Sequence, residues 1–110
     1  MDYSQILKDV ISIDTSVPPG LNYGEVINYL QPLFEKLGFE VKKIYIPQEY
    51  AEGREGRVNL TCRRRELGKP RLIFYAHIDV VPAEGWDAFH PRVANGKIYG
   101  RGAADMKGGI

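Results

Sequence analysis

The most informative segment of this chain reads Leu72-Ile73-Phe74-Tyr75-Ala76-His77-Ile78-Asp79-Val80-Val81-Pro82. Its first five residues form a continuous apolar run, which is typical of a central strand that is buried on both faces. An imidazole and a carboxylate, His77 and Asp79, follow directly where this strand is expected to end. In open α/β sheets, ligands bind beyond the carboxyl ends of the strands, so this placement predicts a functional site.

Two amphipathic helices are predicted before this strand. Apolar residues recur at helical spacing over residues 2–13, and a second apolar face extends from a cap at Asn22 to Leu37. Pro32 lies inside the second pattern, but the apolar period continues past it without a change of phase, so we expect one helix. Gly38 suits the left-handed position that ends a helix.

Alternation and turn signals predict further strands. Residues 47–56 are polar and contain glycine, which indicates a loop, and residues 63–70 have the composition of a charged turn. Asn95-Gly96 is a strong signal for a two-residue hairpin. The predicted strands around these turns are residues 39–46, 58–62, 92–94 and 97–99.

The order of these elements predicts the fold class. Helices followed by several strands favour an α/β fold, a three-layer sandwich with a mixed, largely parallel sheet flanked by helices. Residues from Asp105 onward are expected to approach another helix. A length of 110 residues is enough for one small domain.

Composition places the chain among ordinary globular proteins. Hydrophobic residues make up 44% and charged residues 26%, and the net charge of +1 gives no reason to expect a nucleic-acid or membrane surface. No apolar run approaches the length that spans a bilayer, and the N-terminus lacks the features of a signal peptide. Cys62 is the only cysteine, so no internal disulfide is possible. We therefore expect a cytoplasmic protein.

His77 is the first candidate for chemistry. A neutral imidazole is a good zinc ligand, and its second ring nitrogen then needs an acceptor that fixes the tautomer. Asp79 is well placed to be that acceptor, because it lies on the same side of an extended segment. A core histidine bonded to an ordinary loop aspartate has the same spacing, and the spacing alone favours this simpler interpretation.

A second carboxylate, Asp105, lies in the segment Gly100-Arg101-Gly102-Ala103-Ala104-Asp105-Met106-Lys107-Gly108-Gly109. Small residues there let the backbone come close to an ion or to another strand, and a carboxylate in that position can bridge two cations. The alternative is an N-cap aspartate for the following helix. Lys107 either pairs with Asp105 or is solvated.

Three other features have simpler interpretations. His90 has no evident acidic neighbour at ligand spacing and is expected to be a surface loop residue. The cluster of arginines at residues 63–65 lacks interleaved aromatic residues, so a solvated turn is favoured over a phosphate or nucleic-acid site. Cys62 is expected to be a small buried hydrophobic residue.

Six segments of the chain follow one another in an informative order. They are Ser16-Val17-Pro18-Pro19-Gly20, Leu37-Gly38-Phe39-Glu40-Val41, Asn59-Leu60, residues 77–82, Gly85-Trp86 and residues 97–109. In this order they resemble the N-terminal part of the dinuclear zinc amidohydrolases, which include acetylornithine deacetylase, succinyl-diaminopimelate desuccinylase, aminoacylase and the glutamate carboxypeptidases. The resemblance covers nearly all 110 residues, and its last segment is highly specific.

The resemblance implies a role for each candidate residue. His77 would ligate one metal ion, and Asp105 would bridge both ions of a pair. Asp79 would be the carboxylate that orients His77, a residue often counted as catalytic in this family. The resemblance also implies a cis peptide bond between Asp105 and Met106. Residues 1–110 would form the N-terminal part of a metal-binding catalytic domain of the zinc-peptidase type.

The resemblance also implies which groups these residues lack. The family's general-base glutamate, its other acidic ligands, a late histidine and the lid domain used for dimerisation lie downstream of the position that matches Ile110. His77 and Asp105 alone should bind metal weakly or not at all, because catalytic zinc sites use three protein ligands. We therefore expect these 110 residues to be inactive alone.

The predicted function is metal-dependent hydrolysis of an amide bond in an N-acyl amino acid or a short peptide, of the deacetylase or desuccinylase type. The intact enzyme would hold two zinc ions, or cobalt or manganese. The alternative is a non-catalytic binding or assembly module with the same fold. We expect a small-molecule substrate, no nucleic-acid or membrane partner, and a homo-oligomer, because exposed apolar surface and free strand edges promote association.

Overall fold

The computed structural model describes residues 1–64 and 72–110. The chain divides into two compact units, a first unit of residues 1–22 with 76–110 and a second unit of residues 23–75. The α/β class predicted from the sequence is confirmed, because the described residues contain α-helices together with two small antiparallel sheets.

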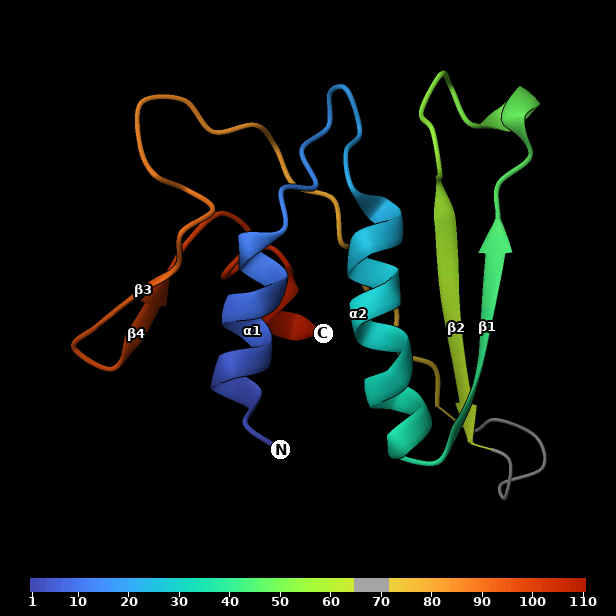
Figure 1. The fold of residues 1–110 in the computed structure, drawn as a ribbon, viewed down its shortest axis with the longest axis horizontal. Helices are drawn as coiled ribbons and strands as arrows, with labels where there is room; N and C mark the ends of the chain where they lie inside the picture. The colour runs from blue at the N-terminus through green and yellow to red at the C-terminus, as the bar shows by residue number, and fades with distance from the viewer. Residues whose placement is uncertain (65–71) are drawn as a thin grey trace. The chain divides into compact units, whose positions relative to one another are not determined.

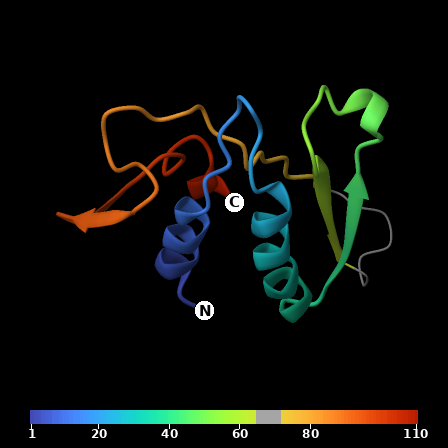
Figure 2. The ribbon, with the colours of Figure 1, turned by 45° about the horizontal axis from the view of Figure 1, so that its top comes forward.

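In the second unit, one helix packs on a two-stranded sheet. Helix α2 (Tyr23–Lys36) contacts strands β1 (Phe39–Tyr45) and β2 (Val58–Arg64), as Figures 1 and 2 show. The two strands are antiparallel, with Phe39 opposite Arg64 and Tyr45 opposite Val58. The buried side chains of α2 include Val26, Ile27 and Leu30.

The prediction of a single helix through Pro32 is confirmed. Proline cannot donate a hydrogen bond to the carbonyl group of Asn28, but both residues lie on the exposed side of α2, where an unpaired carbonyl group costs less than it would in the core. Gly38 has a φ of 83°, the left-handed conformation that turns the chain from α2 into β1.

The connection between β1 and β2 differs in detail from the prediction. The expected loop contains a short 3-10 helix, η1 (Gln48–Tyr50). Strand β2 continues to Arg64, whose guanidinium group lies over the ring of Phe39 at 5.1 Å from its centroid. The turn predicted at 63–70 therefore begins later than expected, and residues 65–70 lie outside the described residues.

In the first unit, the predicted N-terminal helix is confirmed as α1 (Tyr3–Ser12). The Asp2 carboxylate accepts a hydrogen bond from the backbone N–H of Gln5 at 3.1 Å, which caps the first turn. The buried residues Val10 and Ile11 lie near the other end of α1. The 3-10 helix η3 (Lys107–Gly109) contacts α1 close to the C-terminus of the chain (Figures 1 and 2).

The hairpin predicted from Asn95-Gly96 is also confirmed. Strands β3 (Arg92–Ala94) and β4 (Lys97–Tyr99) pair antiparallel on either side of it. Asn95 and Gly96 have φ values of 50° and 72°, which are the paired positive angles of the tight hairpin turn that this dipeptide favours.

The prediction of a buried central strand at residues 72–76 is wrong. Residues 72–75 are between 72% and 89% exposed, and none of the described residues pairs with this segment. A central strand needs hydrogen-bonded neighbours on both edges and packed layers on both faces, and the described residues provide neither. The described residues form two two-stranded antiparallel sheets, and they do not form the expected three-layer sandwich with its mixed sheet.

Parallel pairing within the described part of the chain is limited to an isolated bridge between Ser16 and Val80. The helix expected from Asp105 onward is the single turn of η3. Among the residues with described structure, no helix combines the length and the apolar character needed to cross a membrane.

Candidate metal centre

The segment that follows α1 fixes the backbone beside the candidate histidine. The hydroxyl group of Thr15 donates a hydrogen bond to the carbonyl oxygen of Ile78 at 2.6 Å. The backbone N–H of Val80 donates to the carbonyl oxygen of Thr15 at 3.1 Å, and the N–H of Val17 donates to that of Val80 at 2.9 Å. Because Thr15 is completely buried, water does not compete for these bonds. They hold the chain on both sides of Asp79.

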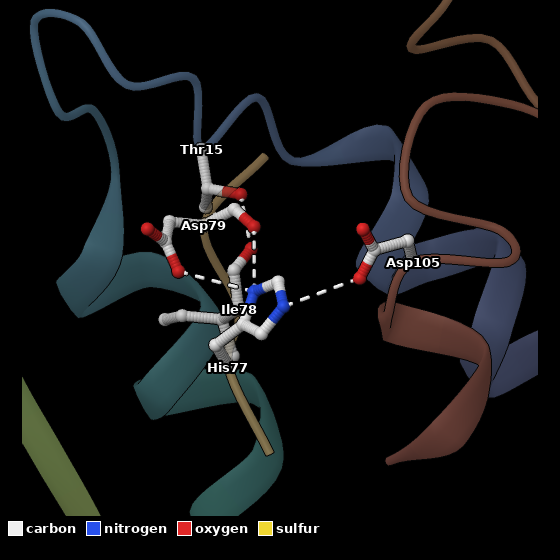
Figure 3. A network of polar contacts seen from close by, with 5 residues as sticks. All are labelled: Thr15, His77, Ile78, Asp79 and Asp105. Atoms are coloured by element: carbon white, nitrogen blue, oxygen red, sulfur yellow. Dashed lines mark hydrogen bonds and ion pairs between the residues drawn. The ribbon is translucent and has the colours of Figure 1, made fainter. Parts of the chain in front are cut away.

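The imidazole of His77 lies between two aspartate side chains (Figure 3). Its Nδ1 atom is 3.2 Å from Oδ1 of Asp79 and 3.0 Å from the backbone carbonyl oxygen of the same residue. Its Nε2 atom is 3.3 Å from Oδ1 of Asp105. The structure therefore brings together the three residues that the sequence analysis selected, although their roles in metal binding and catalysis stay predictions.

The contacts of Asp79 select one tautomer of His77. A carboxylate and a carbonyl group only accept hydrogen bonds, and two such oxygens of Asp79 face Nδ1 where one of Asp105 faces Nε2, so the contacts favour the neutral tautomer with its proton on Nδ1. The lone pair then resides on Nε2 and points towards Asp105. Two lone pairs that face each other at 3.3 Å repel unless a proton or a cation lies between them.

The separation between Nε2 of His77 and Oδ1 of Asp105 suits a shared divalent cation. Zinc binds imidazole nitrogen and carboxylate oxygen at about 2.0–2.2 Å with tetrahedral angles, which puts two such ligand atoms about 3.3–3.5 Å apart. The observed distance of 3.3 Å lies in that range. The residues present thus fit a zinc ion as two of its ligands.

The described residues do not complete such a site. Across residues 1–64 and 72–110, no three His, Cys, Asp or Glu side chains gather in a way that could hold a metal ion. The Asp79 carboxylate contacts Nδ1, on the side of the ring away from Asp105. Only two ligand atoms therefore face one point, where a catalytic zinc ion takes three from the protein.

An open hollow of ≈ 430 Å³ adjoins the histidine. It is lined by Val17, by residues of the His77 segment and by residues 100–105. The side chain of Asp105 is 89% exposed and that of His77 is 38% exposed, so ions and small molecules can reach both.

The small residues around Asp105 let its segment pack closely. A Cβ atom at Gly108 would lie 2.1 Å from the carbonyl oxygen of Ala103, and one at Gly100 would lie 2.5 Å from a methyl carbon of Ile11. Both contacts are too short for any larger residue unless the backbone moves. The peptide bond between Asp105 and Met106 is cis, as the resemblance implied.

Lys107 is almost completely buried, with an exposed fraction of 3%. Its Nζ atom donates hydrogen bonds to the backbone carbonyl oxygens of Val10 at 2.9 Å and of Ile13 at 2.7 Å. Burial lowers the pKa of Lys107 to about 8, and the nearby Asp14 carboxylate acts in the opposite direction. The prediction that Lys107 pairs with Asp105 or is solvated is wrong, because its ammonium group satisfies carbonyl groups at the end of α1.

His90 is a surface residue, as predicted, with a side chain that is 84% exposed. The expectation that it has no acidic neighbour is wrong, because its Nδ1 atom contacts the carboxylate of Asp87, three residues earlier. This exposed pair lies outside the residues that line the hollow. It therefore adds no ligand to the candidate centre.

The sequence of this chain is similar to those of known proteins. The model of "Peptidase family M20/M25/M40" matches residues 73–110, which include all three candidate site residues. A succinyl-diaminopimelate desuccinylase of Nitrosospira multiformis is 42% identical over 69% of the chain. Proteins of the same name from Rickettsia canadensis and Helicobacter pylori are 38% and 35% identical over 98% and 100% of it. The chain spans only 19–30% of the length of these relatives.

Proposed function

Because the chain belongs to peptidase family M20/M25/M40, a family of hydrolases, we propose that His77 and Asp105 are metal ligands of an enzyme that cleaves an amide bond. The observation that carries this proposal is the 3.3 Å approach of Nε2 to Oδ1, with Nδ1 already bonded to Asp79. The names of the relatives favour succinyl-diaminopimelate or a similar N-acyl amino acid as substrate.

Each of the three side chains has a separate task in this proposal. Asp79 accepts a hydrogen bond from Nδ1–H of His77, fixes the orientation of the ring and raises the basicity of Nε2. His77, through Nε2, and Asp105, through its carboxylate, would hold a divalent cation, and the second carboxylate oxygen of Asp105 would be available to another. When bound, zinc, cobalt or manganese supplies the Lewis acidity that polarises an amide carbonyl group and makes water a stronger acid.

We assign residues 1–110 to a catalytic domain of the zinc-peptidase type, whose complete form is a three-layer sandwich with a mixed, largely parallel sheet. Two features of the described residues support this assignment. The apolar side chains of residues 72–75 are exposed and would be buried in a larger sheet. The bridge between Ser16 and Val80 is parallel, as expected for such a sheet.

The 110 residues alone are proposed to bind zinc weakly and to lack activity. The support for this is the absence of a third ligand among the described residues, together with the small fraction of each relative that the chain spans. The proposed partners are a small N-acyl amino acid or peptide and a second copy of the chain.

The test is an assay of the full-length protein with N-succinyl-diaminopimelate, N-acetylornithine and a panel of N-acetyl amino acids. We expect zinc- or cobalt-dependent release of the acyl group from at least one of them, and loss of activity with a chelator. The variants His77→Ala and Asp105→Ala should lose more than about 100-fold in hydrolytic activity. Removing a residue that only hydrogen-bonds to a metal ligand already lowers metal affinity or activity by about 10–100-fold. No hydrolysis and no zinc binding would contradict the proposal and favour a binding or assembly module.

A further inference from the structure

Lys107 forms a long-range connection within the first unit. It begins η3, two residues after Asp105, and its Nζ atom donates to carbonyl oxygens of Val10 and Ile13 at 2.9 and 2.7 Å. Removing an ammonium group from water is costly unless its hydrogen bonds are made inside the protein. With 3% of its surface exposed, Lys107 therefore depends on these two bonds, and they determine where residue 107 lies.

The carboxylate of Asp105 makes few contacts that could hold it in place. Its side chain is 89% exposed, and within the described residues its polar contact is the one with Nε2 of His77. No buried partner holds the carboxylate in place, so its position follows from the backbone of the segment that carries it. That backbone is joined to the end of α1 through Lys107.

The same stretch of chain also holds the histidine. Thr15 and Val17, which follow α1, bond to the backbone of Ile78 and Val80 on either side of Asp79. Figure 3 shows Thr15 on the same side of the imidazole as the backbone of Asp79. Both candidate ligands are therefore connected to one short stretch, residues 10–17. Thr15 bonds to the segment that carries His77, and Lys107 bonds the segment that carries Asp105 to Val10 and Ile13.

We infer that Lys107 is a positioning residue for the metal ligand Asp105. Its two hydrogen bonds to the end of α1 hold the carboxylate at the distance from His77 that a divalent cation requires. This inference rests on the proposed function. Displacing a ligand atom by about 0.5–1 Å is enough to weaken a metal site. A residue that touches neither the cation nor the substrate therefore controls metal affinity if it fixes the position of a ligand.

The test is the zinc affinity of Lys107→Met in the full-length protein, measured by calorimetry against a competing chelator. Methionine keeps the unbranched apolar stem but cannot donate to the two carbonyl groups. We expect the Kd for zinc to rise about 10- to 100-fold, as for other partners that orient a ligand. The matched control is Val26→Ala, which removes a fully buried side chain of α2 in the second unit and should leave the Kd unchanged.

A double-mutant cycle with Asp105→Asn separates positioning from general destabilisation. If Lys107 acts through Asp105, adding Lys107→Met to Asp105→Asn should change the Kd by less than about 2-fold. A Kd that is unchanged in Lys107→Met, or a full effect that persists in the Asp105→Asn background, would overturn the inference.

A measurement on the unmodified protein covers the case in which Lys107→Met does not fold. Saturating zinc should slow amide hydrogen exchange of Gly109 and Ile110 in and after η3, and leave the β1–β2 sheet unaffected. Unchanged exchange at Gly109 and Ile110 would contradict the inference. If His77→Ala and Asp105→Asn leave zinc binding intact, the proposed function fails; if they weaken it and Lys107→Met does not, only this inference fails.

Discussion

The Nε2 atom of His77 lies 3.3 Å from Oδ1 of Asp105, on the edge of the ring opposite to the Nδ1 atom that contacts Asp79. This relationship gives each aspartate a different task, because Asp79 accepts a hydrogen bond from Nδ1 and Asp105 faces the lone pair of Nε2. The proposed metal centre depends on this difference between Asp79 and Asp105.

Replacing Asp79 with asparagine should weaken zinc binding without removing a ligand. The variant keeps the shape of the side chain but loses the charge that makes Nε2 a stronger donor, so the Kd for zinc should rise about 10- to 100-fold. Isothermal titration of the full-length protein measures this. The matched control is Asp87→Asn, which alters the exposed contact between Asp87 and His90 and should leave the Kd within error.

Removing the hydroxyl group of Thr15 should destabilise the first unit. In Thr15→Val the partly buried carbonyl oxygen of Ile78 loses the donor that the buried Thr15 side chain supplies, so the free energy of unfolding should fall by about 1–3 kcal/mol. Urea unfolding of the two variants gives the comparison. The control is Thr61→Val, whose exposed and longer bond of 3.4 Å to Lys42 should contribute less than about 0.5 kcal/mol. Equal losses in the two variants would contradict the prediction.

Much of the local structure could be predicted because its causes are local. The period of the apolar residues identified α2 in spite of Pro32, and the conformational preference of Asn95-Gly96 identified the β3–β4 hairpin. His77 and Asp79 are two residues apart, so their contact follows from the extended backbone between them.

The errors concern partners that are distant in the sequence. The carbonyl groups that hold Lys107 lie 97 and 94 positions away, and no periodic pattern records such a pairing. One indication was available, since the last turn of α1 contains no basic residue of its own to bond its free carbonyl groups. The apolar character of residues 72–76 predicts a buried strand, but burial depends on neighbours that the pattern does not specify.

The thiol of Cys62 should react more slowly than an exposed thiol at mildly alkaline pH. Burial raises its pKa, because desolvation disfavours the thiolate. The raised pKa contributes stability that is present below the unfolded pKa and is lost as the pH rises through the folded value. The rate of iodoacetamide labelling, followed by mass spectrometry from pH 7 to 10, should reach its midpoint at a higher pH in the folded chain than in the chain unfolded in urea. Midpoints at the same pH would contradict this prediction.

The 110-residue chain should self-associate through its exposed apolar segment. Phe74 is 89% exposed within a run of four exposed apolar residues, and contiguous patches of this kind promote association. Phe74→Lys should therefore lower the mass measured by light scattering at a given concentration. Tyr3→Lys, a change at an isolated tyrosine that is 73% exposed, serves as the control and should have no such effect. A monomeric parent chain would contradict the prediction.

The most direct test of the proposed centre is ¹⁵N NMR of the histidine side chains during a zinc titration. His77 and His90 are the two histidines of the 110-residue chain, so the second is an internal reference for non-specific binding. We predict that the Nε2 signal of His77 shifts on zinc addition, that Nδ1 stays protonated, that the His90 signals do not move, and that Asp105→Asn weakens the response. Equal shifts of both histidines, or coordination of His77 through Nδ1, would contradict the account.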